Sequence, residues 1–282
     1  MKITIGLPSR NRPAGLLSVL TAFNALATGA HEITYALIVD DDDYTTLEQL
    51  EHWEKSGMLP VGVRKFAGPR DKTVNARFNN AIASCPADVY SQACDDTFPL
   101  CFHWDKMLAG AIEKVPCFNW QECNDPANAT YPVMGTRWLE AVGRFYPEYF
   151  PFWFADTWIA EVFNLAFAKP IPVINQLQMG GKRGATQGMR DLAFWFEFFT
   201  ATRVERIAEA GRVAKAFGFS LNAERDRAEI LERFAQGDAF QRSRVPLYEA
   251  SFKANLGEPS QVYKAAKFRA ECWMAEHEQV AA

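Results

Sequence analysis

The sequence lacks the residue patterns of folds that are stabilised by structural metal sites or by disulfide bonds. Its 282 residues include only four histidines, which are scattered along the chain without ligand spacing. The six cysteines form no C-x-x-C pair. We therefore expect neither a structural zinc site nor a disulfide framework.

An excess of positive charge and a long uncharged apolar run are also missing. The formal net charge is -4 and the pI is about 5.7, which argues against a surface built for nucleic acid. The most apolar long window, residues 150–168, contains Asp156, Glu161 and Asn164 and predicts a buried helix, not a bilayer span. The first residues lack the apolar core of a secretory signal. We expect a cytoplasmic protein with no transmembrane span.

The chain does have enough apolar residues for a large core, since 49% are hydrophobic and 13% aromatic. Its N-terminal half alternates short apolar runs with helical stretches, a pattern typical of an α/β fold with a mainly parallel sheet. The predicted strands are Lys2–Gly6, Tyr35–Val39, Val61–Phe66 and Val89–Ala93. The predicted helices between them are Pro13–Ala27, Tyr44–Lys55 and Thr73–Ser84. Three β-α units in succession result.

The pattern becomes mixed after Pro99. It predicts helices at His103–Lys114 and Thr157–Phe167 and strands at Cys117–Trp120, Tyr131–Met134 and Pro170–Ile174. The glycines of Gln176–Gly188 indicate a loop that could act as a lid. Everything from Met189 onward has helical character. We therefore predict one domain at 1–188, with halves 1–100 and 101–188, and a helical region at 189–282 that packs on this domain or on a second copy in a homo-oligomer.

Polar clusters follow each of the first four predicted strands. They are Pro8–Arg12, Asp40–Asp43, Gly68–Lys72 and the pair Asp95-Asp96. Ligands of open α/β sheets bind at the carboxyl ends of the strands, so the clusters predict one shared crevice. Carboxylates beside arginine and lysine suit a divalent cation and nucleotide phosphates, for which Arg70 and Lys72 are candidate partners. The pair Asp95-Asp96 could anchor the cation. The alternative for this pair is an acidic turn in which one aspartate caps the following helix and the other is solvated.

The order of these clusters resembles the glycosyltransferases of the GT-A fold, particularly the family 2-like group. The resemblance covers roughly the first two thirds of the chain and depends on order and spacing, not on one motif. The residues that carry it are Pro8, Ser9, Asn11 and Arg12, then Asp40 and Asp41, then Asn75, Arg77 and Asn79, and finally Asp95 and Asp96. The later segment, residues 135–158, is similar to the family's acceptor-side segment.

This resemblance implies a Rossmann-like GT-A sheet and a metal-dependent transfer of sugar from a nucleotide diphosphate, with a UDP-sugar favoured and Mn²⁺ or Mg²⁺ as cofactor. Asp96 would be the metal ligand, and Asp95 would contact the metal-bound water or the ribose. The nucleotide would be lined by Pro8, Ser9, Arg10, Arg12, Asp40 and Asp41, with Arg77 contacting the donor or bracing the crevice. The acceptor stays open: a glycan, a lipid-linked sugar, a protein or a modified nucleobase.

Asp156 is the candidate general base for the acceptor hydroxyl. It lies among Trp153, Phe154 and Trp158, and such surroundings suit a carboxylate that takes up a proton. The family expectation is an inverting transfer. The alternative is that Asp156 caps the helix beginning at Thr157 and that the aromatic residues are core.

Two departures from the family pattern favour a different class of protein. Ala155 stands where the family often has glutamate, and the region from Gln176 to Arg183 has no histidine for the metal. A degenerate GT-A protein that binds a nucleotide or glycan without turnover is therefore the alternative function.

Overall fold

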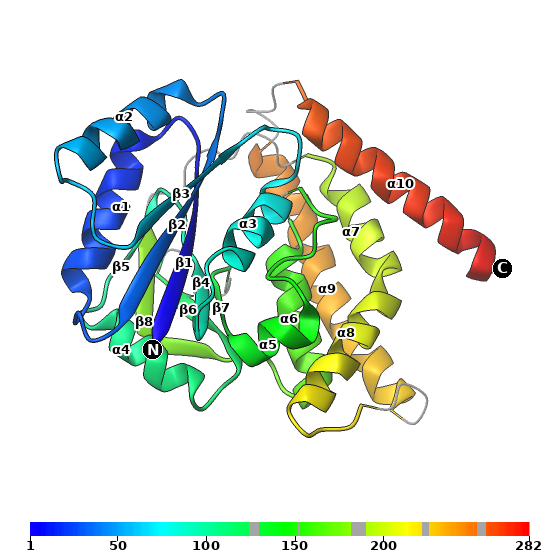
Figure 1. The fold of residues 1–282 in the computed structure, drawn as a ribbon. Coiled ribbons are helices and arrows are strands. Elements are labelled where there is room, and N and C mark those ends of the chain that lie inside the picture. Colours follow the sequence, from blue (N-terminus) through cyan, green and yellow to red (C-terminus); the bar gives the residue numbers. More distant parts are fainter. Residues whose placement is uncertain (124–129, 152, 182–189, 222–225, 253–257, 282) are drawn as a thin grey trace. The chain divides into compact units, whose positions relative to one another are not determined.

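The computed structural model describes residues 1–123, 130–151, 153–181, 190–221, 226–252 and 258–281 (Figure 1). Its contacts divide the chain into two compact units. The first unit comprises Met1–Phe145 and Pro172–Gly184, and the second comprises Tyr146–Ile171 and Ala185–Ala282. This grouping differs from a boundary after residue 188 because Tyr146–Ile171 belongs with the C-terminal helices. The domains drawn from the sequence stay a prediction.

The first unit begins with the three expected β-α units. They are β1 (Lys2–Ser9), α1 (Pro13–Leu26), β2 (Glu32–Asp40), α2 (Tyr44–Lys55), β3 (Val63–Gly68) and α3 (Val74–Ala83), and β4 (Val89–Gln92) follows them. The rest of the unit contains β5 (Thr97–Pro99), α4 (Trp104–Ile112), β6 (Cys117–Glu122), β7 (Pro132–Gly135), α5 (Thr136–Val142) and β8 (Val173–Gly181). The predicted α/β class is confirmed.

The eight strands form one sheet in the order β3-β2-β1-β4-β7-β6-β8-β5. Pairing is parallel from β3 through β2 and β1 to β4, and β7 runs antiparallel to both of its neighbours. Right-handed crossovers put α1 and α2 on one face of β1 and β2 and α3 on the other (Figure 1). The direction of winding reverses between β1 and β4, which makes their carboxyl ends the topological switch point.

The lid loop predicted at Gln176–Gly188 is wrong in its first part. Gln176–Gly181 belongs to β8, which pairs in parallel with β6 and antiparallel to β5. The glycines suggested a loop, but Gly180 lies opposite Phe98 in the strand pair, where a Cβ would approach Leu100 Cδ1 to 2.7 Å. Gly180 is therefore a strand residue that leaves room for the Leu100 side chain. The remainder, Lys182–Gly188, lies outside the described residues.

Local chemistry explains where the first helices begin. Pro13 occupies the first position of α1, where its missing N–H costs nothing. Asp43 caps α2 by accepting a hydrogen bond from the Thr46 amide, and Thr73 caps α3 by accepting one from the Ala76 amide. The capped helices leave the loops before them short and fixed.

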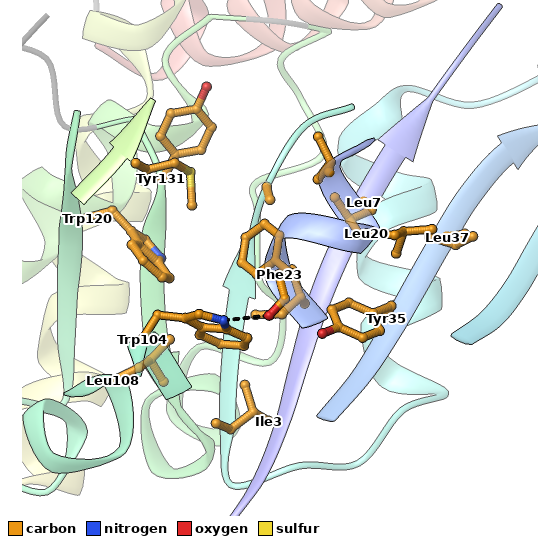
Figure 2. Close-up of a cluster of buried hydrophobic side chains, with 14 of the residues drawn as sticks. Ile3, Leu7, Leu20, Phe23, Tyr35, Leu37, Trp104, Leu108, Trp120 and Tyr131 are labelled. Atoms are coloured by element: carbon orange, nitrogen blue, oxygen red, sulfur yellow. Dashed lines mark hydrogen bonds between the residues drawn. The ribbon is translucent and has the colours of Figure 1, made fainter. Parts of the chain in front are cut away.

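Phe23 of α1 is the centre of the core under the sheet (Figure 2). Its ring meets Tyr35, Trp104 and Trp120 edge to face, with centroids 5.1–6.4 Å apart. The Trp104 indole N–H donates to the Phe23 carbonyl at 2.8 Å, so this buried polar group is satisfied (Figure 2). Burying one such ring stabilises the fold by about 1.5–3 kcal/mol. The cluster thus fixes α1, and with it the loop that joins β1 to α1.

The second unit is helical. Its helices are α6 (Ala155–Phe167), α7 (Leu192–Ala201), α8 (Arg203–Ala216), α9 (Arg227–Phe252) and α10 (Gln261–Ala281). Phe150 is at the centre of its aromatic core, with Trp158, Trp195 and Phe198 within about 6 Å between ring centroids. The helical character predicted after Met189 is confirmed for the described residues. No helix in this described part of the chain is long and apolar enough to span a bilayer.

Candidate active site

Asp95 and Asp96 are the two central residues of a hydrogen-bonded β-turn. The Thr97 amide donates to the Cys94 carbonyl at 3.1 Å, and the Cys94 amide donates to Thr97 Oγ1 at 2.8 Å. Strand β5 follows at once, so the alternative in which an aspartate caps a following helix is wrong. Sequence reasoning missed Thr97, although a hydroxyl residue closing an acidic turn is a recognisable signal. The turn presents both carboxylates from a rigid backbone.

The last residue of β1 and the loop that follows it reach this turn with one side chain each. Ser9 Oγ donates to Asp95 Oδ2 at 2.8 Å. Arg12 Nη1 lies 3.2 Å from Asp95 Oδ1 and 2.9 Å from Asp96 Oδ2. The loop therefore joins the carboxyl ends of β1 and β4 at the switch point.

The same loop also reaches the end of β2. Arg10 Nη1 contacts Asp40 Oδ2 at 2.6 Å and also binds Asp42. Asn11 has a left-handed backbone conformation with a φ of 54°, and its backbone N–H donates to Asp43 Oδ2 at 2.7 Å. Asparagine tolerates this left-handed conformation better than most residues. Consecutive residues of one loop thus hold two clusters of carboxylates together.

Arg77 of α3 fixes Asp40 from the other side. Its guanidinium binds the Asp40 carboxylate and the carbonyls of Val39 and Phe66, and its side chain is only 11% exposed. These contacts clamp the ends of β2 and β3. They agree with the bracing role that the sequence offered for Arg77 as the alternative to direct donor contact.

Burial and charge act against each other on these groups. Burial raises the pKa of Asp95, while the hydrogen bond from Ser9 and the charge of Arg12 oppose that rise. Burial would lower the pKa of Arg12, but the charges of Asp95 and Asp96 raise it overall. The hydrogen bond to Asp42 raises the pKa of Arg10, and that of Asp42 is lowered in return. Arg10 and Arg12 therefore stay charged and paired.

The remaining residues predicted to bind the donor lie around this network. Pro8 is half-buried near the end of β1. Asp41, Arg70 and Lys72 are exposed beside the ends of β2 and β3, and Arg70 is near enough to Asp42 to help lower its pKa. The structure brings the polar clusters of the first four strands to one edge of the sheet. Their roles toward a ligand stay predictions.

Comparisons with known proteins give a fold but no sequence relative. No family model and no curated protein matches the chain. Among solved structures, a Pyrobaculum calidifontis mannosyltransferase in complex with GDP-Man and Mn²⁺ is similar over 99% of this chain and 80% of its own, with a TM-score of 0.55 at 11% identity. The chain has the GT-A fold.

Two further structures support this assignment of the GT-A fold. S. aureus TarS 1-349 in complex with UDP-GlcNAc has a TM-score of 0.53 at 12% identity, with 84% of this chain and 80% of that chain covered. Glucosyl-3-phosphoglycerate synthase from Mycobacterium tuberculosis, in complex with Mn²⁺, UDP and its product, has a TM-score of 0.51 at 13% identity, with 73% and 79% covered. The resemblance seen in the sequence is confirmed as a likeness of fold.

The acidic turn of this GT-A fold suits a divalent cation by its donor chemistry. Asp95 and Asp96 offer hard carboxylate oxygens on adjacent residues of a fixed turn. No group of three or more histidine, cysteine, aspartate or glutamate side chains gathers in the described ranges. The two aspartates would therefore hold a cation together with ligand or water oxygens, at a place that the Arg12 guanidinium now contacts.

Asp156, the predicted base, belongs to the second unit. It lies half-buried in the first turn of α6, whose N-cap is Phe154 with a φ of 69°. The alternative that Asp156 itself is the N-cap is therefore wrong, whereas Phe154 and Trp158 beside it are buried as core. An acidic side chain in the first turn also interacts favourably with the helix dipole. A catalytic role for Asp156 stays a prediction.

Gly15 sets how closely α1 approaches the acidic turn. A Cβ at this position would lie 2.6 Å from the Asp95 carbonyl oxygen, which is backbone and cannot move alone. We expect Gly15→Ala to lower the free energy of unfolding by about 1–3 kcal/mol through overpacking. In α4, a Cβ at Gly110 would meet nothing within 4 Å. Gly110→Ala should therefore raise the free energy of unfolding by about 0.5–1 kcal/mol. Urea denaturation of both variants tests the contrast, and equal effects would contradict it.

Proposed function

We propose that the protein is a metal-dependent glycosyltransferase that moves a sugar from a nucleotide diphosphate to an acceptor hydroxyl. The observation that carries the proposal is the acidic turn Asp95-Asp96 at the switch point of a GT-A sheet, joined to the end of β1 and the loop after it by Ser9 and Arg12. Open α/β sheets bind ligands at this place. Within the GT-A fold we assign the chain to the family 2-like group on its motif order.

The donor class is suggested by the similar structures. The Pyrobaculum mannosyltransferase holds GDP-Man, TarS holds UDP-GlcNAc and the mycobacterial synthase holds UDP. Two of these structures also contain Mn²⁺. A nucleoside diphosphate is the feature common to all three. We propose a UDP-sugar as the donor and Mn²⁺ or Mg²⁺ as the cation.

The roles of the residues follow from their chemistry. Asp96 and Asp95 would hold the cation, which when bound offsets charge on the departing diphosphate. Arg70 and Lys72, exposed at the strand ends, supply cationic donors for phosphate. Asp156 would take the proton of the acceptor hydroxyl as that oxygen bonds to the sugar carbon and the bond from carbon to phosphate oxygen breaks. A direct displacement of this kind inverts the sugar carbon.

Two observations favour a protein that binds without turnover. Arg12 already pairs with both aspartates of the turn, and Ala155 stands where a second acid would start α6. A degenerate GT-A protein would hold a nucleotide or glycan at the same sheet edge. Slow hydrolysis of the donor that depends on Asp96 would eliminate this alternative.

A thermal-shift screen with nucleotide-sugars tests the proposed function. The protein is heated with UDP-, GDP- and other nucleotide-sugars in Mn²⁺, in Mg²⁺ and in EDTA. We expect one nucleotide-sugar to raise the melting temperature only with metal, because a ligand that binds the native state alone stabilises it by mass action. Release of the nucleoside diphosphate is then measured with that donor. No stabilisation by any donor would reject the proposal.

Asp156→Asn separates catalysis from donor binding. Asparagine keeps the size of the side chain but cannot take up a proton, so we expect the transfer rate to fall by about 10²–10⁴. The metal-dependent thermal shift with donor should stay at the wild-type value. An unchanged transfer rate would mean that another group, or the acceptor itself, disposes of the proton.

A further inference from the structure

The Arg12 guanidinium contacts the carboxylate oxygens of Asp95 and Asp96 that would coordinate a divalent cation. Its Nη1 is 3.2 Å from Asp95 Oδ1 and 2.9 Å from Asp96 Oδ2, so one nitrogen bridges the two carboxylates. Its side chain is 41% exposed, whereas those of Asp95 and Asp96 are 8% and 22% exposed. The turn fixes the backbone that carries both carboxylates and Ser9 holds the Asp95 carboxylate, whereas the arginine that contacts them is the most exposed of the three side chains.

We propose that Arg12 is a resident counter-ion that a divalent cation must displace, and that the nucleotide diphosphate assists this exchange. This inference rests on the proposed function, because it assigns how the same site is loaded. Metal alone has to break the Arg12 ion pairs. When a diphosphate is present, the released guanidinium gains a new anionic partner of the kind that arginine binds well. Metal and nucleotide therefore bind cooperatively.

Arg77 and Arg10 cannot act as this exchangeable counter-ion. Arg77 is 11% exposed and also bonds the carbonyls of Val39 and Phe66, so it is fixed in the structure. Arg10 pairs with Asp40 and Asp42, at the end of β2 and not at the acidic turn. Arg12 combines contact with both turn carboxylates and an exposed side chain.

The exchange has a thermodynamic signature. If Arg12 competes with the cation, removing its charge and its hydrogen bonds strengthens metal binding to the nucleotide-free protein. Binding couplings of this kind are typically about 5–150-fold, and they are reciprocal between the two ligands. In the wild type, UDP should therefore strengthen Mn²⁺ binding, and Mn²⁺ should strengthen UDP binding by the same factor. Without Arg12, most of that coupling should disappear.

Mn²⁺ titration of the full-length protein, followed by the electron paramagnetic resonance signal of the free ion, tests this without any turnover. The proteins are the wild type, Arg12→Gln and Arg12→Lys, each with and without UDP. Arg10→Gln is the matched control, since it removes an arginine from the same loop but not from the acidic turn. Asp96→Asn shows that the measured binding is at the turn. Melting temperatures confirm that each variant is folded.

We expect Arg12→Gln to bind Mn²⁺ at least about fivefold more tightly than the wild type without UDP, and to lose most of the strengthening by UDP. Arg12→Lys should lie between the two. In the titration without UDP, Arg10→Gln should stay near the wild type, because Arg10 pairs with Asp40 and Asp42 and not with the acidic turn. If Arg12→Gln binds no more tightly, or Arg10→Gln gains as much, while Asp96→Asn still abolishes binding, the counter-ion role is overturned and the proposed function stands. If none of the proteins binds Mn²⁺ with or without UDP, both are overturned.

Discussion

Replacing Asp96 with asparagine is expected to lower the rate of sugar transfer by about 10²–10³. Both aspartates of the turn contact Arg12. The Asp96 side chain is 22% exposed and that of Asp95 is 8% exposed, so the substitution removes the more accessible carboxylate. An amide is a weak ligand for a hard cation, so the donor diphosphate would leave without charge compensation. Initial rates with a saturating donor measure the effect.

The matched control for this experiment is Asp42→Asn. Asp42 is an exposed carboxylate that follows β2, which β1 separates from β4 in the sheet, and it pairs with Arg10. Its replacement removes the same charge close by, so we expect at most a few-fold loss of rate, since exposed ion pairs contribute little. Equal losses in the two variants would mean that general electrostatics, and not a bound cation, explains the effect of Asp96.

Replacing Glu161 with alanine should cause a large loss of stability in the second unit. Glu161 of α6 forms an ion pair with Arg206 of α8, whose side chain is 0% exposed. Burial lowers the pKa of Arg206 and raises that of Glu161, and the attraction between the two groups opposes both shifts. The variant leaves a buried charge without its carboxylate, which costs about 3–5 kcal/mol. Denaturation in urea measures the loss.

Two comparisons show whether the stability lost in Glu161→Ala comes from leaving Arg206 buried without its carboxylate. The double variant Glu161→Leu with Arg206→Met removes both charges, and we expect it to recover most of the stability, because apolar replacements of a buried pair are often neutral. Glu229→Ala breaks a pair with Arg233 one turn away on α9, where the Glu229 side chain is 60% exposed, and should cost less than about 0.5 kcal/mol. A small loss for Glu161→Ala would show that water reaches Arg206.

The part of the fold that sequence predicted well is the part built from local patterns. The limits of α2 were predicted at Tyr44 and Lys55, and the structure has the same limits. Strong apolar periodicity, a proline at the start of α1 and capping residues all act within a few positions of the chain. Because the strands are parallel, their polar ends had to meet at one edge, which the sequence also predicted.

The part that sequence missed depends on partners far away in the chain. β5 has three residues, too few for a periodic pattern, and it exists because Phe98 lies opposite Gly180 of β8. β8 itself contains two glycines, and its part from Gln176 onward was predicted as a loop, whereas its first residues lie in the predicted strand Pro170–Ile174. Within the site, the sequence supplied the acidic and basic residues but not their pairing. Arg12 contacts Asp95 and Asp96 while Arg10 contacts Asp40, and Asn11 between the two arginines has the αL conformation, which the sequence alone does not predict.

The strand order also implies an order of assembly during synthesis. The acidic turn is followed directly by β5, but the partner of β5 is β8, which is made only after α5 and α6. Domains made on the ribosome emerge from the N-terminus, and contacts between distant segments form late. Strand β5, which follows the turn, therefore has no β8 to pair with until residue 181 has emerged. A chain that ends before β8 would contain Ser9, Arg12, Asp95 and Asp96 and still lack the strand that fixes them.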